Sequence, residues 1–240
     1  MSKIQAVILA GGKGSRLRPF TKVLPKPLVP VGDFPIAEII IRQLKHHGFK
    51  NIVIATGHLA GLIETYFGDG KQWGVHIQYV KEKKPLGTAG ALKLIQPLAD
   101  HFLVINGDTL TNIHFRKLMD YHKAKKAAAT IVVKERVVKT DFGVIEYDRS
   151  YAFQNYFEKP THRSSVSTGI NVFSKKCPAF IRRGESIGMP ELMLRLKSEQ
   201  QPVYCYRTKD IWLDLGRLDD LEEAQVVFRR NKAKFIPASK

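Results

Sequence analysis

The sequence has few of the features that mark disulfide-rich secreted proteins, membrane proteins or zinc proteins. It contains only two cysteines, Cys177 and Cys205, whose separation gives neither a zinc motif nor a disulfide framework. This scarcity favours a reducing cytoplasm as the location. No apolar run approaches the roughly 18 to 20 residues of a membrane-spanning helix. The short apolar segment 4–10 leads into two glycines and a lysine, which is not a signal-peptide cleavage site. We therefore expect a cytoplasmic protein without a membrane partner.

Acidic residues are also scarce, with 22 Asp and Glu against 39 Lys and Arg and a formal net charge of +17. A charge of this size suits a polyanionic partner, and nucleic acid is the first class to weigh. The basic residues are dispersed, however, and no aromatic-and-basic strip or helix-turn-helix pattern accompanies them. We expect most of them to form a solvated surface, a few to face phosphate groups, and no nucleic acid to be bound.

The eight histidines form no zinc pattern. His46 and His47 are adjacent and point to different faces of a predicted helix, so we expect solvated side chains. No Ser-His-Asp or Cys-His arrangement can be argued from the order of residues. The chemistry of this protein is therefore expected to rest on carboxylates and cations.

The composition is that of a globular α/β protein. The chain has 240 residues, of which 44% are hydrophobic and 25% charged, and it has no repeat, long linker or low-complexity segment. Apolar runs alternate with helical patterns, which predicts a Rossmann-like, doubly wound mixed sheet in three α/β/α layers. Strands are expected at 4–10, 51–56, 75–80, 102–106 and 128–137, and helices at 37–47, 59–67, 88–95 and 115–125.

The pattern changes after residue 141. Short alternating segments at 143–147, 151–158 and 167–173 predict an antiparallel or mixed extension of the same sheet. A helix at 189–197, a strand at 202–206 and a terminal helix at 218–231 complete the expected order. The terminal helix carries an apolar stripe formed by Leu221, Ala224, Val227 and Phe228. Such a stripe predicts either core packing or a contact between two copies in a homodimer, and both readings stay open.

A glycine-rich loop follows the first predicted strand. Ligands of open α/β sheets bind beyond the carboxyl ends of the strands. At this place Gly11, Gly12 and Gly14 would let backbone amides approach an anion, while Lys13 and Arg16 add positive charge. The order of residues differs from a Walker A loop, and Leu17 stands where a dinucleotide-binding motif needs a third glycine. The loop therefore predicts an anion site of a different kind.

Prolines dominate the segment after this loop, at positions 19, 25, 27, 30 and 35. They forbid a regular helix and predict a long, stiff loop over the edge of the sheet. Lys26 lies between two of them, in Leu24-Pro25-Lys26-Pro27-Leu28. We expect the neighbouring prolines to hold this lysine toward a reacting phosphate.

Two segments carry a family resemblance: Leu9-Ala10 and the loop that continues to Pro19, and then Pro25-Lys26-Pro27-Leu28. Together they resemble the signature of the sugar-1-phosphate nucleotidyltransferases. This family includes mannose-1-phosphate and heptose-1-phosphate guanylyltransferases and glucose-1-phosphate uridylyl-, thymidylyl- and cytidylyltransferases. The resemblance implies the nucleotide-diphospho-sugar transferase fold. It also implies one domain over residues 1–240, with a nucleotide-binding half over about 1–140 and a sugar-phosphate-binding half over about 141–240.

The resemblance implies a set of nucleotide-binding residues, with Ser15 where the family usually has Thr. The segment 82–92 resembles the part of the family that reads the base. A carboxylate at Glu82 can accept from the guanine N1–H and amino group together, whereas a glutamine would suit uracil or thymine, which favours GTP. The full set is Leu9, Ala10, Gly11, Gly12, Gly14, Ser15, Arg16, Lys26, Glu82, Gly87 and Thr88.

Two separated aspartates are expected to bind Mg²⁺. Asp108 follows a buried strand, at the end of the sheet where ligands bind. Asp214 lies in Trp212-Leu213-Asp214, which resembles the second metal motif of the family. Arg16, Lys26 and Asp108 are the expected catalytic residues.

The acceptor site is implied by three further resemblances. Glu158-Lys159-Pro160 resembles the sugar-phosphate motif, in which the lysine would neutralise the acceptor phosphate and the glutamate would bind sugar hydroxyls. The segments 142–145 and 167–171 resemble the edges of the sugar pocket. The expected residues are Gly143, Glu158, Lys159, Thr168 and Asn171.

The resemblance thus implies transfer of a nucleotidyl group, with GTP favoured, to a mannose- or heptose-type sugar 1-phosphate, releasing pyrophosphate in nucleotide-sugar biosynthesis. A uridylyl-, thymidylyl- or cytidylyltransferase acting on glucose or an N-acetylated hexose stays open. So do a non-catalytic regulatory subunit of the same fold and, from the charge alone, a nucleic-acid-binding protein.

Overall fold

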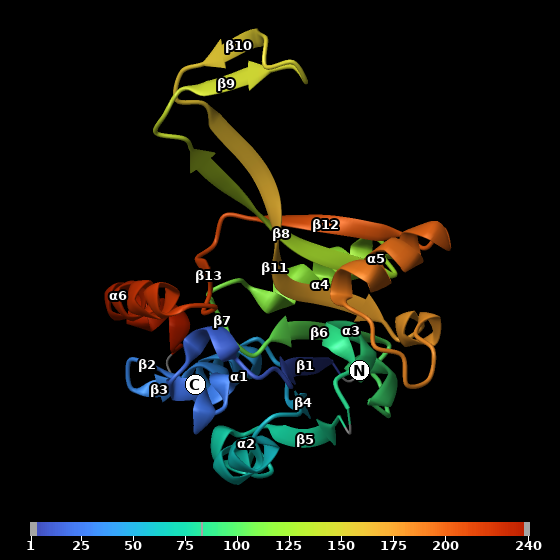
Figure 1. Cartoon of the computed structure of the whole chain (residues 1–240). Helices are drawn as coiled ribbons and strands as arrows, with labels where there is room; N and C mark the ends of the chain where they lie inside the picture. Colours follow the sequence, from blue (N-terminus) through green and yellow to red (C-terminus); the bar gives the residue numbers. More distant parts are fainter. Residues whose placement is uncertain (1–3, 83, 238–240) are drawn as a thin grey trace.

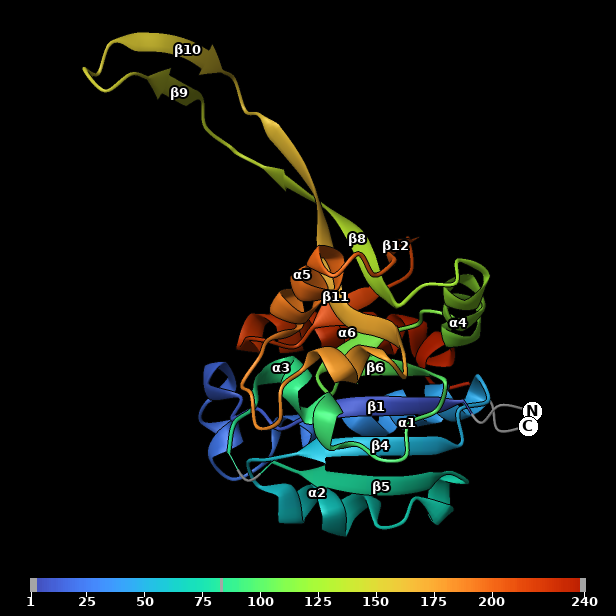
Figure 2. The same ribbon diagram turned by 90° about the vertical axis from the view of Figure 1, so that its right-hand side faces the viewer.

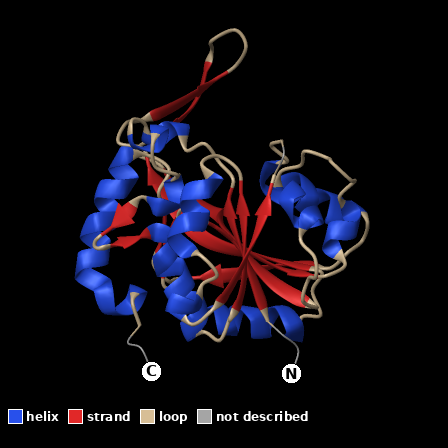
Figure 3. Ribbon diagram, turned by 90° about the horizontal axis from the view of Figure 1, so that it is seen from below, coloured by secondary structure: helices blue, strands red, loops and turns tan. Residues whose placement is uncertain are grey.

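The computed structural model describes residues 4–82 and 84–237. Its centre is a mixed sheet of seven strands in the order β12-β8-β11-β6-β1-β4-β5, with helices on both sides (Figure 3). The predicted doubly wound fold is confirmed. The strands of this sheet are β1 (Gln5–Ala10), β4 (Asn51–Thr56), β5 (His76–Lys81), β6 (His101–Asn106), β8 (Ala129–Lys139), β11 (Thr161–Ser174) and β12 (Val203–Thr208).

The two faces of the sheet bury separate apolar clusters, because alternate residues of a strand point to opposite sides. In β1, Ala6 and Ile8 face one cluster and Val7 faces the other. The first cluster is covered by α1 (Ile36–His46), α2 (Ala60–Phe67), α4 (Phe115–Ala124) and α6 (Leu218–Phe235). The second is covered by α3 (Gly87–Gly90) and α5 (Met189–Ser198).

The strand directions fix where a ligand can bind. β1 pairs in parallel with β4 and β6, and β4 pairs in parallel with β5, so their carboxyl ends meet at one edge. β11 runs antiparallel to both of its neighbours, which makes the sheet mixed. Within the described residues, no helix is long and apolar enough to cross a membrane.

The proline-rich segment contains no α-helix before Ile36, as expected. It forms three single-turn 3-10 helices, η1 (Ser15–Leu17), η2 (Phe20–Lys22) and η3 (Lys26–Leu28), and a small hairpin of β2 (Pro30–Val31) and β3 (Phe34–Pro35). Further short 3-10 turns are η4 (Lys71–Trp73), η5 (Ala91–Leu94) and η6 (Cys177–Phe180). The helix expected at 88–95 is therefore divided between α3 and η5.

The terminal helix α6 packs against its own chain. Ala224 and Phe228 are fully buried in the first cluster, and Leu221 and Val227 pack partly buried against it. Of the two readings of this stripe, core packing is confirmed. An antiparallel pair that the sequence did not predict, β7 (Thr109–Thr111) with β13 (Trp212–Asp214), joins the start of α6 to the end of β6.

The segment expected to extend the sheet does not do so over residues 143–158. β9 (Val144–Tyr147) and β10 (Phe153–Phe157) pair only with each other. They sit at the end of a two-stranded extension of β8 and β11 that stands away from the body in two perpendicular views (Figures 1 and 2). We call residues 135–165 the arm, and residues 140–160 its tip. The alternation of the sequence identified strands correctly but not their pairing partners.

A buried histidine makes stability depend on pH. His122 of α4 has no exposed surface and lies between His101 and the hydroxyl of Thr130, at 3.0 and 2.9 Å. Burial, followed by the positive charges of His101 and Lys123, lowers its pKa from 6.5 to about 4. Between these two values the unfolded chain binds a proton that the folded chain rejects, so acidification favours unfolding.

We expect the free energy of unfolding to fall as pH drops from 6.5 toward 4, with a loss of roughly 3 kcal/mol from His122 alone. Urea titrations across this range should give a shallower pH dependence for His122→Gln than for the wild type. His76→Gln, at an exposed position, serves as the control and should keep the wild-type slope. Equal slopes in all three proteins would contradict the assignment.

Candidate active site

A cavity of about 590 Å³ opens at the carboxyl ends of β1, β4, β5 and β6. Its walls come from the glycine-rich loop, from η3 and from the segments that follow these strands. Nine of the predicted site residues line it: Leu9, Ala10, Gly11, Gly12, Lys26, Glu82, Gly87, Thr88 and Asp108. The remaining lining residues are Lys13, Pro27, Gly57, His58, Lys84, Pro85, Asn106 and Gly107.

The floor of the cavity is set by a close contact between the ends of β1 and β6. The amide of Gly107 donates a hydrogen bond of 2.9 Å to the carbonyl of Leu9. A Cβ added to Gly107 would lie 2.9 Å from that oxygen and 3.3 Å from the ring of Pro27, so only glycine permits this packing. Pro27 itself is buried in η3. The contact therefore brings the proline-braced Lys26 beside the residue that follows Gly107.

That residue is Asp108, and Lys26 forms an ion pair with its Oδ2 atom. The two side chains are 12% and 21% exposed, so the charges face the cavity with little surrounding water. The other carboxylate oxygen of Asp108 is buried and has no hydrogen-bond partner among the described residues. An unpaired buried carboxylate oxygen is costly unless a ligand or cation satisfies it.

The second predicted aspartate lies next to the first. β7 and β13 pair Asp214 with Thr109, and the amide of Leu215 donates to the carbonyl of Asp108 at 3.0 Å. Burial and then the negative charge of Asp108 raise the pKa of Asp214, while Lys26 and Arg16 act in the opposite direction. Two carboxylates that repel each other attract a cation between them.

A divalent cation would have two protein carboxylates here and no more. Among the described residues, no group of three or more His, Cys, Asp or Glu side chains converges on one point. Mg²⁺ typically uses one or two carboxylates and takes its remaining ligands from water and substrate phosphates. The donor set and the unsatisfied oxygen of Asp108 therefore fit Mg²⁺ held jointly with a phosphate ligand.

Arg16 lies beside this carboxylate pair rather than on the cavity wall. A Cβ added to Gly216 would lie 3.2 Å from Asp214, 3.3 Å from Asp220 and 3.4 Å from the guanidinium carbon of Arg16. The guanidinium is thus near Asp214 at the rim of the site. Gly14, in the left-handed conformation, and Ser15, exposed in η1, shape the turn that leads to Arg16.

The opposite wall contains the residues expected to meet the base. One oxygen of Glu82 accepts from the amide of Leu86 at 2.9 Å, and the other points toward Gly11. Gly87 has a positive φ of 74° and packs against the carbonyl of Ile187. The hydroxyl of Thr88 accepts from the amide of Met189 at 2.8 Å. Glu82 and Thr88 therefore also hold the wall in place.

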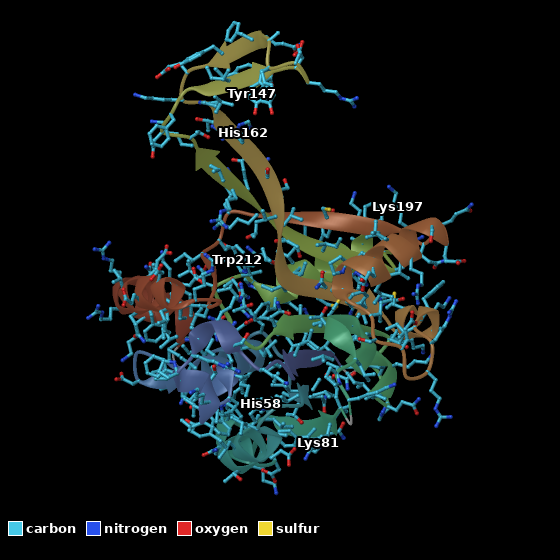
Figure 4. The ribbon with its side chains drawn as sticks, in the orientation of Figure 1. His58, Lys81, Tyr147, His162, Lys197 and Trp212 are labelled. Carbon is cyan, nitrogen blue, oxygen red and sulfur yellow. The ribbon has the colours of Figure 1, made fainter. Side chains whose placement is uncertain are left out.

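Two of the predicted acceptor residues are buried in the sheet and do not line the cavity. The hydroxyl of Thr168 donates to the carbonyl of Val132 at 3.0 Å, and its own carbonyl accepts from the indole of Trp212 (labelled in Figure 4) at 2.8 Å. Asn171 is 2% exposed, and the Oδ1 atom of its side-chain amide has no partner among the described residues. Both lie on β11, next to the strand that ends at Asn106.

The other three acceptor residues are brought together, but on the arm. Glu158 accepts from the hydroxyl of Tyr156 at 3.0 Å and lies 3.9 Å from the amine of Lys159. The ring of Tyr156 covers Gly143. None of these residues lines the cavity, and Lys159 is 57% exposed. Figure 4 shows that the tip and the cavity lie far apart, with Tyr147 of the tip and His58 of the cavity toward opposite ends of the molecule.

Several lining residues were not predicted from the sequence. Gly57 and His58 follow β4, and Asn106 ends β6. The rule that ligands bind beyond the carboxyl ends of parallel strands was applied to β1 and to Asp108. Applied to every predicted strand, it would have identified these three residues as well.

Comparison with known proteins gives one consistent result. The family model described as "Nucleotidyl transferase" matches residues 5–230. A UTP–glucose-1-phosphate uridylyltransferase of Synechocystis is 33% identical, over 92% of this chain and 62% of the relative. This chain thus spans about three fifths of that protein. A D-glycero-α-D-manno-heptose 1-phosphate guanylyltransferase of Aneurinibacillus thermoaerophilus is 32% identical, over 92% of this chain and 97% of the relative.

Solved structures show the same similarity. A crystal structure from Bacillus anthracis, assigned as a glucose-1-phosphate thymidylyltransferase and determined with sucrose, superimposes with a TM-score of 0.77. It is 27% identical in sequence, and the match covers 99% of this chain and 98% of that one. The similar proteins therefore differ in the base that their names specify.

The wall beside Glu82 gives a test of the geometry. A Cβ added at Gly87 would lie 2.4 Å from the carbonyl oxygen of Ile187, in a backbone conformation that side chains disfavour. We expect Gly87→Ala to lower the free energy of unfolding by about 2 kcal/mol or more in urea titrations. Gly61→Ala in α2, where nothing lies within 4 Å, should leave stability unchanged or raise it. Equal unfolding midpoints for Gly87→Ala and the wild type would contradict the packing described.

Proposed function

The chain belongs to the nucleotidyl transferase family, and we propose that it transfers a nucleotidyl group from a nucleoside triphosphate to a sugar 1-phosphate. GTP is the favoured donor, and a mannose- or heptose-type 1-phosphate is the favoured acceptor. The products would be a nucleoside diphosphate sugar and pyrophosphate. The observation that carries this proposal is the pairing of Lys26 with Asp108 on the cavity floor, with Asp214 beside them.

The donor would lie along the glycine-rich loop. The backbone amides of this loop and the side chain of Lys13 line the cavity next to Lys26. Glycine amides bind phosphate oxygens closely because no Cβ intervenes. Arg16 would hold the β and γ phosphates from the rim, since its planar guanidinium can donate to two oxygens. Lys26 would exchange its contact with Asp108 for one with the α phosphate.

The reaction itself is an in-line displacement. A phosphate oxygen of the sugar 1-phosphate forms a bond to the α phosphorus, and the bond from that phosphorus to the bridging oxygen of the β phosphate breaks. Pyrophosphate leaves with the electron pair. The acceptor needs no general base, because the second pKa of a phosphate monoester is about 6 and the group is largely dianionic at neutral pH. The residues therefore act by orienting the two phosphates and neutralising their charge.

Asp108 and Asp214 would hold Mg²⁺ in this reaction. The unsatisfied oxygen of Asp108 and the raised pKa of Asp214 support this role. The cation would supply charge neutralisation at the reacting phosphate. Lys26, whose amine now pairs with Asp108, would contact the substrate when Asp108 serves as a metal ligand.

GTP is favoured because of Glu82. Its carboxylate lies in the cavity with one oxygen held by Leu86 and the other on the side of Gly11. An ionised carboxylate can only accept hydrogen bonds, and guanine offers two adjacent donors at N1 and the amino group. The guanylyltransferase among the similar proteins supports this choice. The uridylyl- and thymidylyltransferases keep the other bases as alternatives.

The remaining parts of the proposal concern surroundings and partners. Both cysteines are free thiols, Cys177 buried and Cys205 exposed, which supports a reducing cytoplasm. Glu158 and Lys159 would bind the acceptor sugar and its phosphate. The net charge is proposed to serve anionic substrates, with no nucleic acid or membrane as a partner.

Asp108→Ala should reduce pyrophosphate release by at least about a thousandfold, because it removes a metal ligand and leaves Lys26 without its orienting partner. The measurement is coupled pyrophosphate detection with the five common triphosphates against mannose, heptose, glucose and N-acetylated hexose 1-phosphates. Asp100→Ala is the matched control, since Asp100 precedes β6 at the opposite end of that strand and pairs with exposed Lys175. Normal turnover and normal Mg²⁺ dependence in Asp108→Ala would overturn the proposed site.

Glu82→Gln tests the choice of base. The amide keeps an acceptor for Leu86 but presents a donor where the carboxylate accepted, so guanine loses a partner and uracil gains one. We expect kcat/KM for GTP to fall about tenfold or more relative to that for UTP. The exposed Glu199→Gln should leave the ratio unchanged. If Glu82→Gln also left it unchanged, Glu82 would not read the base.

A further inference from the structure

The arm has the character of a surface that is normally covered. Half of the large hydrophobic side chains exposed in the described chain lie between residues 137 and 157. On the tip they are between 41% and 80% exposed: Phe142, Ile145, Tyr147, Tyr151, Phe153, Tyr156 and Phe157. Contiguous exposed apolar residues of this kind mark interaction surfaces.

Four of these residues lie on one face of the hairpin, whereas Phe157, paired with Val144, lies on the other. Tyr147 lies opposite Phe153, and Ile145 lies opposite Tyr156. A bulge between Phe153 and Asn155 keeps Phe153 and Tyr156 of β10 on the side of Ile145 and Tyr147. Tyr151 stacks on Tyr147, with ring centroids 5.4 Å apart. An isolated two-stranded hairpin is marginally stable in water, so such a face needs a surface to pack against.

The body of the same chain does not supply that surface. β12 accompanies β8 only as far as Lys134, and beyond it two strands continue alone to the pair formed by Lys139 and Thr161. This stem carries the tip roughly 17 Å from the sheet, at 3.3 Å per residue. In the described chain, every hydrogen bond and ion pair of residues 140–160 stays within the tip. Figures 1 and 2 show the tip clear of the body from two directions.

The charge of the tip identifies what it fits. Residues 140–160 contain four acidic side chains, Asp141, Glu146, Asp148 and Glu158, and two basic ones, Arg149 and Lys159. The tip is therefore acidic on a chain whose net charge is +17. The cavity is edged by Lys13, Lys26 and Lys84. A second copy of this chain offers a strongly basic body to an acidic, apolar tip.

The residues that line the cavity do not include the two proposed to bind the acceptor, Glu158 and Lys159. Among residues 4–82 and 84–237, all of the lining residues fall between Leu9 and Asp108. The residues proposed to bind the acceptor phosphate and sugar, Lys159 and Glu158, are on the tip. We propose that the tip of one copy docks over the cavity of a second copy and completes its acceptor site. The exchange is reciprocal about a two-fold axis, so a dimer holds two composite sites.

This inference rests on the proposed function for the role of Lys159, whereas the docking itself does not. The mass in solution tests the docking without any turnover. The wild-type chain should sediment as a dimer, and the double variant Tyr147→Ser, Phe153→Ser should sediment as a monomer that still unfolds in one cooperative transition. Leu194→Ser, which removes a side chain 66% exposed on α5, should remain a dimer. A monomeric wild type, or a dimeric double variant, overturns the docking.

Complementation tests the composite site. Asp108→Ala and Lys159→Ala are each expected to be inactive. The first lacks the proposed metal ligand of the cavity, and the second lacks the proposed phosphate ligand of the tip. Co-expression should restore about a quarter of wild-type activity, because half of randomly paired dimers are mixed and each has one intact site. Full activity of Lys159→Ala alone, or no restoration on co-expression, overturns the composite site. Inactivity of the wild type toward every substrate pair refutes the proposed function, and the sedimentation result still decides the docking.

Discussion

The ion pair of Lys26 with Asp108 joins two parts of the chain that are 82 residues apart, and the cavity depends on it. The pair exists because the ends of β1 and β6 approach closely enough for Gly107 to donate to Leu9 and for Pro27 to pack against Gly107. A larger residue at position 107 would separate these ends. The placement of these two charges is thus a consequence of strand packing. Buried prolines hold the amine of Lys26, and the end of a buried strand holds the carboxylate of Asp108.

The strands and the proline-rich segment that build the cavity could be predicted from the sequence, for physical reasons. The central parallel strands β1, β4 and β6 are buried on both faces, so they stand out as continuous apolar runs, and 51–56 and 102–106 match β4 and β6 to within a residue. Prolines around Lys26 restrict the backbone whatever the tertiary context. Local patterns were less informative where pairing decides the structure. Nothing near Trp212-Leu213-Asp214 indicates that β13 pairs with β7, which is the contact that brings Asp214 to Asp108.

The arm is where sequence reasoning from patterns reached its limit. Alternation at 143–147 and 151–158 identifies strands with an apolar side, and in most proteins that side faces the core of the same chain. The register of β8 with β11 continues past the end of β12, which directs both strands away from the sheet. Register is a long-range property that no window of the sequence contains. The segments 143–147 and 151–158 were therefore expected to extend the sheet, and their aromatic residues are found in solvent.

The exposed tip and the open cavity both need to be shielded from water. Transfer of a nucleotidyl group to a phosphate competes with attack by water, so the reacting groups must be shielded once both substrates are bound. In the described part of the chain the residues that line the cavity fall between Leu9 and Asp108. A group of exposed apolar side chains able to exclude water lies on the tip, at the end of a two-stranded stem. A contact that buries the aromatic face of the tip against a basic cavity satisfies both requirements at once. In the proposed dimer the acidic tip would be the complement of the basic body, and the net charge of the chain would serve this docking as well as the proposed binding of phosphates.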